Sequence, residues 1–387
     1  PTLKMITTAN RLASVQEYYF SRKLREVAQM VQKGHPVINM GIGSPDLAPH
    51  PEVIKALSNA MEHPRAHMYQ SYQGLPELRS AIAAFYHKHY QVTLDPNTEV
   101  LPLMGSKEGI MHISMAFLNK GDQVLFPNPG YPTYAAVTKL VEAEPVLYNL
   151  MAANHWQPDF EALEALDTSR VKIMWINYPH MPTGSEAQAE TFDRLIAWAK
   201  ARNVLLVNDN PYSFVLTEEP QSILSRPGAM DVAIELNSLS KSFNMAGWRV
   251  GMLSGKAESI QAVLKVKSNM DSGMFFGIQQ GAIAALKADN VWFESLNKIY
   301  SKRRKLVEQL ATKLGAVYDP KSVGLFVWAK LPSGAVDAET FIDKILQEQH
   351  IFITPGTIFG SQGEGYIRFS LCVPEATIEE AIKRISS

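Results

Sequence analysis

One lysine of the chain stands among residues that suit an aldehyde cofactor carrying a phosphate. Within the segment Asn237–Gly251, Lys241 follows the hydroxyl residues Ser238 and Ser240 and precedes Arg249. A lysine amine joins an aldehyde only when it can lose its proton, and a nearby guanidinium lowers the lysine pKa and also clamps phosphate oxygens. The two serines would add neutral donors to the same phosphate. A surface lysine in a serine-rich turn would explain this segment alone, so the interpretation depends on other segments that fit the same cofactor.

A carboxylate and a phenol follow a second apolar run. The segment Val207–Tyr212 places Asp209 near the end of a candidate strand and Tyr212 three residues later. A buried aspartate stabilises a protonated pyridine ring, so electrons from a substrate Cα–H bond can flow into the ring, and Tyr212 can donate to the ring's 3-oxygen. An Asx-Pro turn that closes the strand explains the same residues. Both interpretations can hold together.

An asparagine follows a third apolar run, Val171–Ile176. Two prolines and a glycine in the stretch 177–184 favour a defined loop over a helix. The amide of Asn177 could share the 3-oxygen with Tyr212 and also meet a substrate carboxylate. In isolation the segment is typical of a turn.

Two further loops complete the pattern. The stretch Gly105–Ile110 lies between a candidate strand and a candidate helix, so its backbone N–H groups would form a phosphate cradle at a helix N-terminus. It lacks the spacing of a nucleotide P-loop, and small residues before a helix are common caps. After the next strand, Tyr131 could stack on a flat ring, although a tyrosine packed in an ordinary loop is the commoner case.

Alternating short β-rich runs and longer helical patterns must position these residues. The candidate strands are 99–104, 123–127, 171–177, 204–209, 232–236 and 250–254, and several are continuous apolar runs, as in a sheet covered on both faces. The order predicts an α/β protein whose large domain has a mostly parallel sheet flanked by helices. A long charged helix at 292–314 and strands at 324–329, 351–354 and 366–370 indicate a smaller α+β domain. We divide the chain into an N-terminal arm with part of the small domain at 1–45, the large domain at 46–290 and the small domain at 291–387.

Composition excludes several classes of partner and site. The 387 residues carry 37 basic and 38 acidic side chains, with no basic run for a nucleic acid or an anionic membrane and no apolar run long enough for a membrane helix. The single cysteine, Cys372, favours a reducing compartment, and we expect a cytoplasmic protein. The ten histidines include no H-E-x-x-H motif, no G-x-S-x-G elbow occurs, and His87 and His89 point to different faces of a candidate helix, so we expect no metal site.

Together these segments resemble the class I and II aminotransferases, which are pyridoxal 5'-phosphate (PLP) enzymes of fold type I in the aspartate aminotransferase family. The resemblance runs nearly end to end and implies a seven-stranded type of large-domain sheet. It implies that Lys241 is the Schiff-base lysine, that Asp209 pairs with the pyridine nitrogen, and that Tyr212 and Asn177 hold the 3-oxygen. It further implies that Tyr131 stacks on the ring, and that the phosphate is surrounded by Ser106, Lys107, Ser238, Ser240 and Arg249.

Three more segments carry the resemblance. The stretch Tyr69–Arg79 is similar to the family's Y-x4-G-x-P-x-L-R pattern, which implies that Tyr69 reaches the phosphate of a partner subunit in a homodimer with shared active sites. The stretch Tyr366–Ser370 is similar to the carboxylate-binding strand, which implies that Arg368 grips the substrate α-carboxylate bidentately. The stretch Gly41–Asp46 is similar to the early G-x-P-D loop, which implies that the Gly43 backbone approaches that carboxylate. As a dinucleotide fingerprint this stretch fails, because Asp46 takes the place of the third glycine.

The expected activity is transfer of an amino group from an L-amino acid to a 2-oxo acid such as 2-oxoglutarate, with no nucleic acid and no membrane as partner. Two alternatives stay open: a PLP-dependent carbon–sulfur lyase on the same fold, and a non-catalytic PLP-binding regulator, for which the chain ahead of Gly41 leaves little room. An acidic donor would call for a second cation near its side chain, and no arginine occurs between Arg249 and Arg303, although Lys265 and Lys267 do, so we expect a neutral, fairly large donor. Its pocket wall would include Tyr18, Tyr19 and Phe20. One departure from the family is His180-Met181, where relatives more often carry asparagine before Pro-Thr-Gly, and it indicates an unusual substrate pocket.

Overall fold

A seven-stranded mixed sheet forms the centre of the computed structural model, which describes residues 6–17 and 19–386. The spatial order of the strands is β2 (Val100–Leu103), β8 (Gly251–Gly255), β7 (Ala233–Ser238), β6 (Leu205–Asp209), β5 (Val171–Ile176), β3 (Gln123–Asn128) and β4 (Glu144–Asn149). Strand β8 is antiparallel to both of its neighbours, and the other pairings are parallel. The six strands predicted for this region are therefore present, and the expected mostly parallel sheet is confirmed.

Strand β4 is an edge strand that the sequence pattern did not predict. Only Tyr148 is buried in it, and Glu144, Pro145, Leu147 and Asn149 are exposed. An edge strand with little burial has neither the continuous apolar run of a central strand nor a clean alternation, so the hydrophobic pattern gave no signal.

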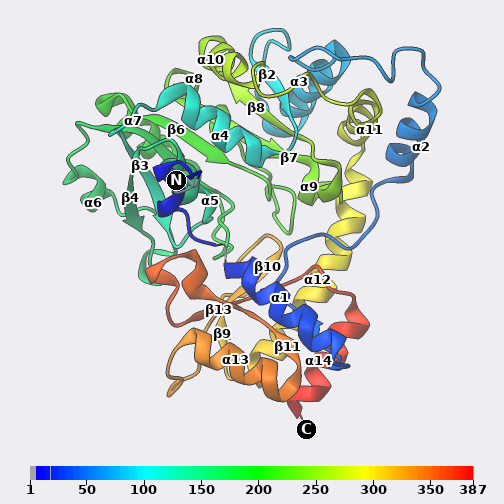
Figure 1. The fold of residues 1–387 in the computed structure, drawn as a ribbon, viewed down its shortest axis with the longest axis vertical. Helices are drawn as coiled ribbons and strands as arrows, with labels where there is room; N and C mark the ends of the chain where they lie inside the picture. Colours follow the sequence, from blue (N-terminus) through cyan, green and yellow to red (C-terminus); the bar gives the residue numbers. More distant parts are fainter. Residues whose placement is uncertain (1–5, 18, 387) are drawn as a thin grey trace, which may run out of the picture.

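Helices cover both faces of the sheet (Figure 1). One face packs against α4 (Ser106–Phe117), α5 (Thr133–Leu140) and α10 (Ala257–Lys267). The other packs against α3 (Pro76–Tyr90), α6 (Phe160–Glu164), α7 (Ala189–Arg202) and α11 (Phe276–Leu286), and α11 also contacts α2 (Pro51–Ala60). Consecutive strand residues point to opposite cores, as Leu206 and Val207 do. Burial on both faces is the reason that these strands read as continuous apolar runs.

A second group of elements lies at the other end of the molecule (Figure 1). Four antiparallel strands are ordered β12 (Thr354–Pro355), β13 (Tyr366–Ser370), β10 (Phe326–Lys330) and β9 (Val317–Tyr318), with α13 (Ala338–Gln349) and α14 (Glu375–Ser386) beside them. The N-terminal helix α1 (Tyr19–Gln32) also lies here, and β1 (Ile38–Asn39) pairs in parallel with β11 (Ile351–Phe352). Residues Val27, Ile38 and Met40 share one core with this C-terminal group. The predicted divisions after residues 45 and 290 stay a prediction, which limited proteolysis would test.

The long helix α12 (Asn290–Lys313) is tied to the predicted G-x-P-D loop by a buried ion pair. Arg303 donates to both carboxylate oxygens of Asp46 at 2.6 and 3.0 Å, and it also lies 3.4 Å from Glu375. A two-point contact of this kind fixes the angle between the partners as well as their distance. The loop that carries Gly43 is thereby held against the C-terminal group. Within the described ranges, no helix has the length and the apolar character needed to cross a membrane.

Candidate active site

The polar residues that follow β5, β6 and β7 meet at the carboxyl edge of the sheet, where parallel strands place their following loops together. They line a pocket of about 200 Å³. Ten of the predicted site residues line it: Ser106, Lys107, Tyr131, Asn177, Asp209, Tyr212, Ser238, Ser240, Lys241 and Arg249. Segments separated by more than a hundred residues in the sequence thus form one cavity.

Asp209 is the buried acid of this pocket. Tyr134 donates to its Oδ2 at 2.7 Å, while Oδ1 is buried and has no hydrogen-bond partner among the described residues. Burial raises the pKa of Asp209 to about 6, although the bond from Tyr134 opposes the rise. A buried carboxylate oxygen without a donor calls for one, and a protonated pyridine nitrogen is such a donor. The unpaired Oδ1 of Asp209 therefore fits the ring nitrogen of the expected cofactor.

Tyr134 is a site residue that the sequence reasoning missed. Its ring stacks on Trp175 at 5.0 Å between ring centroids and meets Tyr131 edge-on at 5.6 Å. The available signal was its place three residues after Tyr131, in the first turn of α5, which begins at Thr133.

Lys241 lies on the short helix α9 (Leu239–Ser242) at the end of β7. Burial lowers the pKa of Lys241, and the charges of Arg368 and Arg249 lower it further, whereas Cys372 opposes them. Its Nζ donates to the backbone oxygen of Gly43 at 2.6 Å. An amine held in this way is closer to its neutral, nucleophilic form than an exposed lysine.

The turn between β2 and α4 packs against Arg249, and together they form a candidate anion site. Gly105 has φ +84°, and a Cβ on it would lie 2.2 Å from a guanidinium nitrogen of Arg249, so glycine makes room for that side chain. Gly251 packs against the amide nitrogen of Ser106 in the same way, since a Cβ there would lie 2.6 Å from it. Helix α4 has twelve residues and points its N-terminus at the pocket lined by Ser238 and Ser240. The residues present therefore fit a phosphate.

The loop after β5 is held by Asn177. Its amide nitrogen donates to the backbone oxygen of Asp209 at 2.7 Å, and its oxygen accepts from the backbone of Met181 at 2.9 Å. These bonds use the oxygen and one of two N–H groups, so the second N–H is the group that a contact with the ring 3-oxygen would use. His180 Nδ1 lies 2.6 Å from the hydroxyl of Thr183, and burial lowers the pKa of His180 to about 3. His180 is therefore neutral near pH 7 and shapes the loop.

Arg368 lies on β13 beside Met181, which lines the pocket. One terminal nitrogen of Arg368 lies 3.3 Å from Met181 Sδ, and the other donates to the backbone oxygen of Gly41 at 2.7 Å. The guanidinium carbon lies 3.8 Å from the ring centroid of Phe326. The same ring leaves no room for a side chain at position 43, where a Cβ would lie 2.3 Å from it. The ring of Phe326 thus packs against both Arg368 and Gly43, whose backbone oxygen accepts from Lys241.

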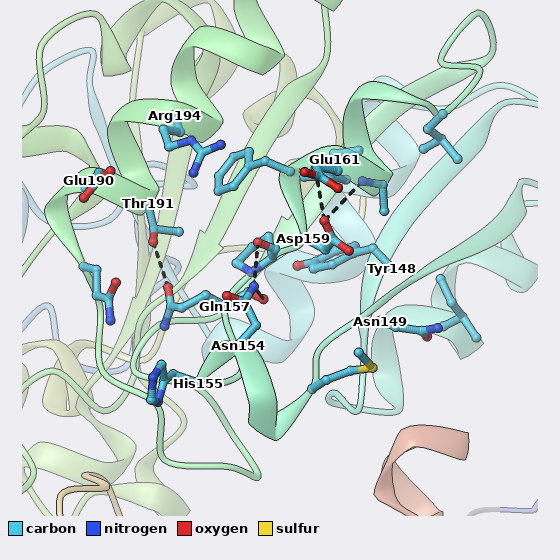
Figure 2. Close-up of a pocket in the computed structure, with 18 residues that line it drawn as sticks. Tyr148, Asn149, Asn154, His155, Gln157, Asp159, Glu161, Glu190, Thr191 and Arg194 are labelled. Atoms are coloured by element: carbon cyan, nitrogen blue, oxygen red, sulfur yellow. Dashed lines mark hydrogen bonds between the residues drawn. The ribbon is translucent and has the colours of Figure 1, made fainter.

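Three predicted site residues, Gly43, Tyr69 and Arg368, are not among the residues that line this pocket. Tyr69 is 91% exposed and does not line the pocket of its own chain. A larger cavity of about 770 Å³ lies beside β4, α6 and α7, as Figure 2 shows, and it contains none of the predicted site residues. Polar side chains in this cavity bind one another or the backbone: Gln157 accepts from Thr191 at 2.8 Å, and Asp159 caps α6.

The fold and the pocket define a PLP-dependent enzyme of fold type I, in which a buried lysine, a buried acid and an anion site surround one small cavity. The family model "Aminotransferase class I and II" matches residues 35–385, and the chain belongs to this family. It is a PLP-dependent aminotransferase, so the lyase and regulator alternatives are set aside.

Similar proteins agree with this assignment. An LL-diaminopimelate aminotransferase of Aquifex aeolicus is 40% identical over 385 residues, which is 99% of each chain. The substrate-bound BacF structure from Bacillus subtilis has 35% identity and a TM-score of 0.94, and the match covers 98% of this chain and 97% of that one. An aromatic aminotransferase of Pyrococcus horikoshii has 27% identity and a TM-score of 0.86, with coverage of 93% and 97%.

Proposed function

We propose that this aminotransferase moves the amino group of a large, neutral L-amino acid to a 2-oxo acid such as 2-oxoglutarate. The observation that carries the proposal is the apolar surrounding of Arg368. Its guanidinium carbon lies 3.8 Å from the ring centroid of Phe326, 4.8 Å from that of Phe359 and 5.6 Å from that of Phe20. These rings and the thioether of Met181 offer an apolar surface beside the group that would grip the α-carboxylate.

Of the other expected wall residues, Tyr19 lies beside Arg22, whose guanidinium carbon is 5.4 Å from its ring centroid. Tyr18 lies outside the described residues.

We assign the ring-binding roles as follows. Bound PLP supplies an aldehyde carbon for the substrate nitrogen and a protonated ring that accepts electron density from Cα. Asp209 would hold the ring nitrogen protonated, Tyr212 and Asn177 would donate to the 3-oxygen, and Tyr131 would cover one face of the ring. Burial raises the pKa of Tyr212, although the charge of Arg368 opposes the rise, so its phenol keeps the proton that this bond needs.

The remaining roles concern protons and charge. Lys241 would hold the cofactor covalently at rest and, as a neutral amine, would carry a proton from the substrate Cα. Arg368 would bind the α-carboxylate with two parallel N–H bonds, near the backbone of Gly43. The phosphate would be held by Ser106, Lys107, Ser238, Ser240 and Arg249.

A second donor has support of a different kind. The relative from Aquifex aeolicus is named for LL-diaminopimelate, and it is similar along the whole chain. That donor carries an ammonium and a carboxylate at its far end, and both would have to be paired on binding. The aromatic surface around Arg368 favours the neutral donor over this one.

A substrate panel tests the proposal. We would measure kcat/KM for methionine, phenylalanine, leucine, alanine, aspartate and LL-diaminopimelate with 2-oxoglutarate, using Lys241→Ala as the inactive control. Methionine, phenylalanine or leucine should exceed aspartate and LL-diaminopimelate by at least about tenfold in kcat/KM, because a side-chain charge that is left unpaired against an apolar surface is costly to desolvate. LL-diaminopimelate or aspartate at the top would refute the neutral donor. Turnover by Lys241→Ala, or no visible absorbance from bound PLP, would refute the site itself.

We also propose a homodimer with shared active sites, and a cytoplasmic location stays a prediction from the sequence. Tyr69 is 91% exposed, and large apolar side chains near it are exposed as well, namely Met68, Tyr72, Met270 and Phe275. Exposed apolar groups at the surface support a protein interface. Mixing the inactive variants Lys241→Ala and Tyr69→Ala should restore activity, because a mixed dimer with shared sites has one site with both native residues. A monomer in sedimentation analysis, or no recovery after subunit exchange, would contradict it.

A further inference from the structure

A buried group of charged side chains lies beside the turn between β2 and α4, where the cofactor phosphate is proposed to bind. Lys267 at the end of α10 is fully buried and pairs with Glu108 at 3.2 Å and with Asp271. Glu108 is in the first turn of α4, and its other oxygen lies 3.3 Å from His112 Nε2. None of these four residues has a role in the proposed reaction.

The group is bonded to the turn before α4 and to Gly273, which packs against the segment that carries Tyr69. Glu108 accepts from the backbone of Met104 at 2.6 Å, which fixes the turn just before α4. Asp271 accepts from the backbone of Gly273 at 2.8 Å. Gly273 in turn packs against the backbone oxygen of Gln70, since a Cβ there would lie 2.3 Å from it. The group therefore lies between the anion site of its own chain and the segment beside Tyr69.

The charge of Glu108 is the reason that Lys267 matters. A carboxylate in the first turn of α4 competes with a bound phosphate for the same positive helix end and repels it. Carboxylates and imidazole of Glu108, His112 and Asp271 lie within 4.8 Å of one another, as in a cation site, but here the ammonium of Lys267 supplies the positive charge. Although burial raises the pKa of Glu108, the nearby His112, the charge of Lys267 and the bond from Met104 lower it overall, so the carboxylate stays ionised.

We infer that Lys267 is a positioning residue for the cofactor phosphate: it neutralises Glu108 and keeps this carboxylate turned toward Met104, so the N-terminus of α4 stays available to the phosphate. The inference rests on the proposed phosphate site. It predicts that loss of Lys267 weakens the binding of a phosphorylated ligand and leaves its unphosphorylated analogue unaffected. A general loosening of the fold would weaken both.

The test compares PLP with pyridoxal, which lacks the phosphate. Full-length protein freed of PLP by dialysis is titrated with each compound, for Lys267→Met and for Lys265→Met, an exposed lysine on the same helix. In Lys267→Met, we expect the Kd for PLP to rise on the order of tenfold or more, because an uncompensated charge acts on the anion site, and the Kd for pyridoxal to change less than about twofold. Lys265→Met should change neither. Equal weakening of both ligands, or no change for PLP, overturns the inference.

A comparison on a second background keeps the test decisive if Lys267→Met alone does not fold. On a Glu108→Gln background, Lys267→Met should leave the Kd for PLP within about threefold, because its target charge is gone. A further tenfold loss on that background would overturn the inference. Arg249→Gln tests the proposed phosphate site separately: it should weaken PLP and leave pyridoxal unaffected, and if it does not discriminate between them, the phosphate site is at fault and not the role of Lys267.

Discussion

Asp209 provides the sharpest prediction, because its burial has a calculable cost when the cofactor is absent. Its pKa rises from 3.8 to about 6 on folding, mainly through burial. Each pKa unit corresponds to about 1.4 kcal/mol, so ionised Asp209 lowers the unfolding free energy of the cofactor-free protein by about 3 kcal/mol at pH 8. Asp209→Asn removes that cost. The variant should therefore be more stable than the wild type at pH 8 while its kcat falls by roughly 100-fold or more, because the ring loses its acid partner.

The sign of the pH dependence separates this explanation from others. Because the folded-state pKa is raised, Asp209 is protonated and costs no stability below pH 3.8. The unfolding free energy of the wild type then falls as the pH rises through about 6 and the buried carboxylate ionises. The stability gain of Asp209→Asn should thus shrink from about 3 kcal/mol at pH 8 toward zero near pH 4. Urea unfolding of the cofactor-free proteins, followed by tryptophan fluorescence at several pH values, measures this difference.

Asp193 offers a matched control, since its bond with Arg226 lowers its pKa. Asp193→Asn should therefore lose stability at pH 8, where Asp209→Asn gains it. A gain for Asp209→Asn that is the same at pH 4.5 and pH 8, or a loss at pH 8, would show that the burial of the charge is not what raises the pKa of Asp209.

Two further predictions concern neighbours of the same pocket. Gly105→Ala and Gly121→Ala both place a side chain at positive φ, +84° and +85°, at a cost of about 1 to 2 kcal/mol each. Only Gly105→Ala meets Arg249, whereas a Cβ at Gly121 has nothing within 4 Å, so PLP affinity in equilibrium dialysis should fall for Gly105→Ala alone. Tyr134→Phe removes the bond that lowers the pKa of Asp209, so that pKa should rise above about 6 and kcat should fall about tenfold. The pH dependence of the unfolding free energy of the cofactor-free variant measures the shift, and a midpoint that stays where it is in the wild type would contradict the assigned role of Tyr134.

The local pattern of apolar and polar residues in the sequence determined the central strands and the residues that follow them. The runs that became β5, β6 and β7 are apolar because both faces of the sheet are covered, and their carboxyl ends had to place Asn177, Asp209 and Ser238 at one edge. The chemistry proposed for Lys241 was inferred from residue types within a dozen positions of it. Such information is local, so the sequence alone could carry it.

Other features were decided only by tertiary structure. Met181 and Arg368 are 187 residues apart and meet because β13 faces the loop after β5. Tyr134 became the partner of Asp209, 75 residues away, only when α5 packed on the sheet. Lys267 pairs with Glu108, which lies 159 residues earlier in the sequence, because α10 packs beside α4. Neither hydrophobic periodicity nor motif spacing encodes these pairings, because the distance between two side chains on different elements is set by how the helices and sheets pack against one another.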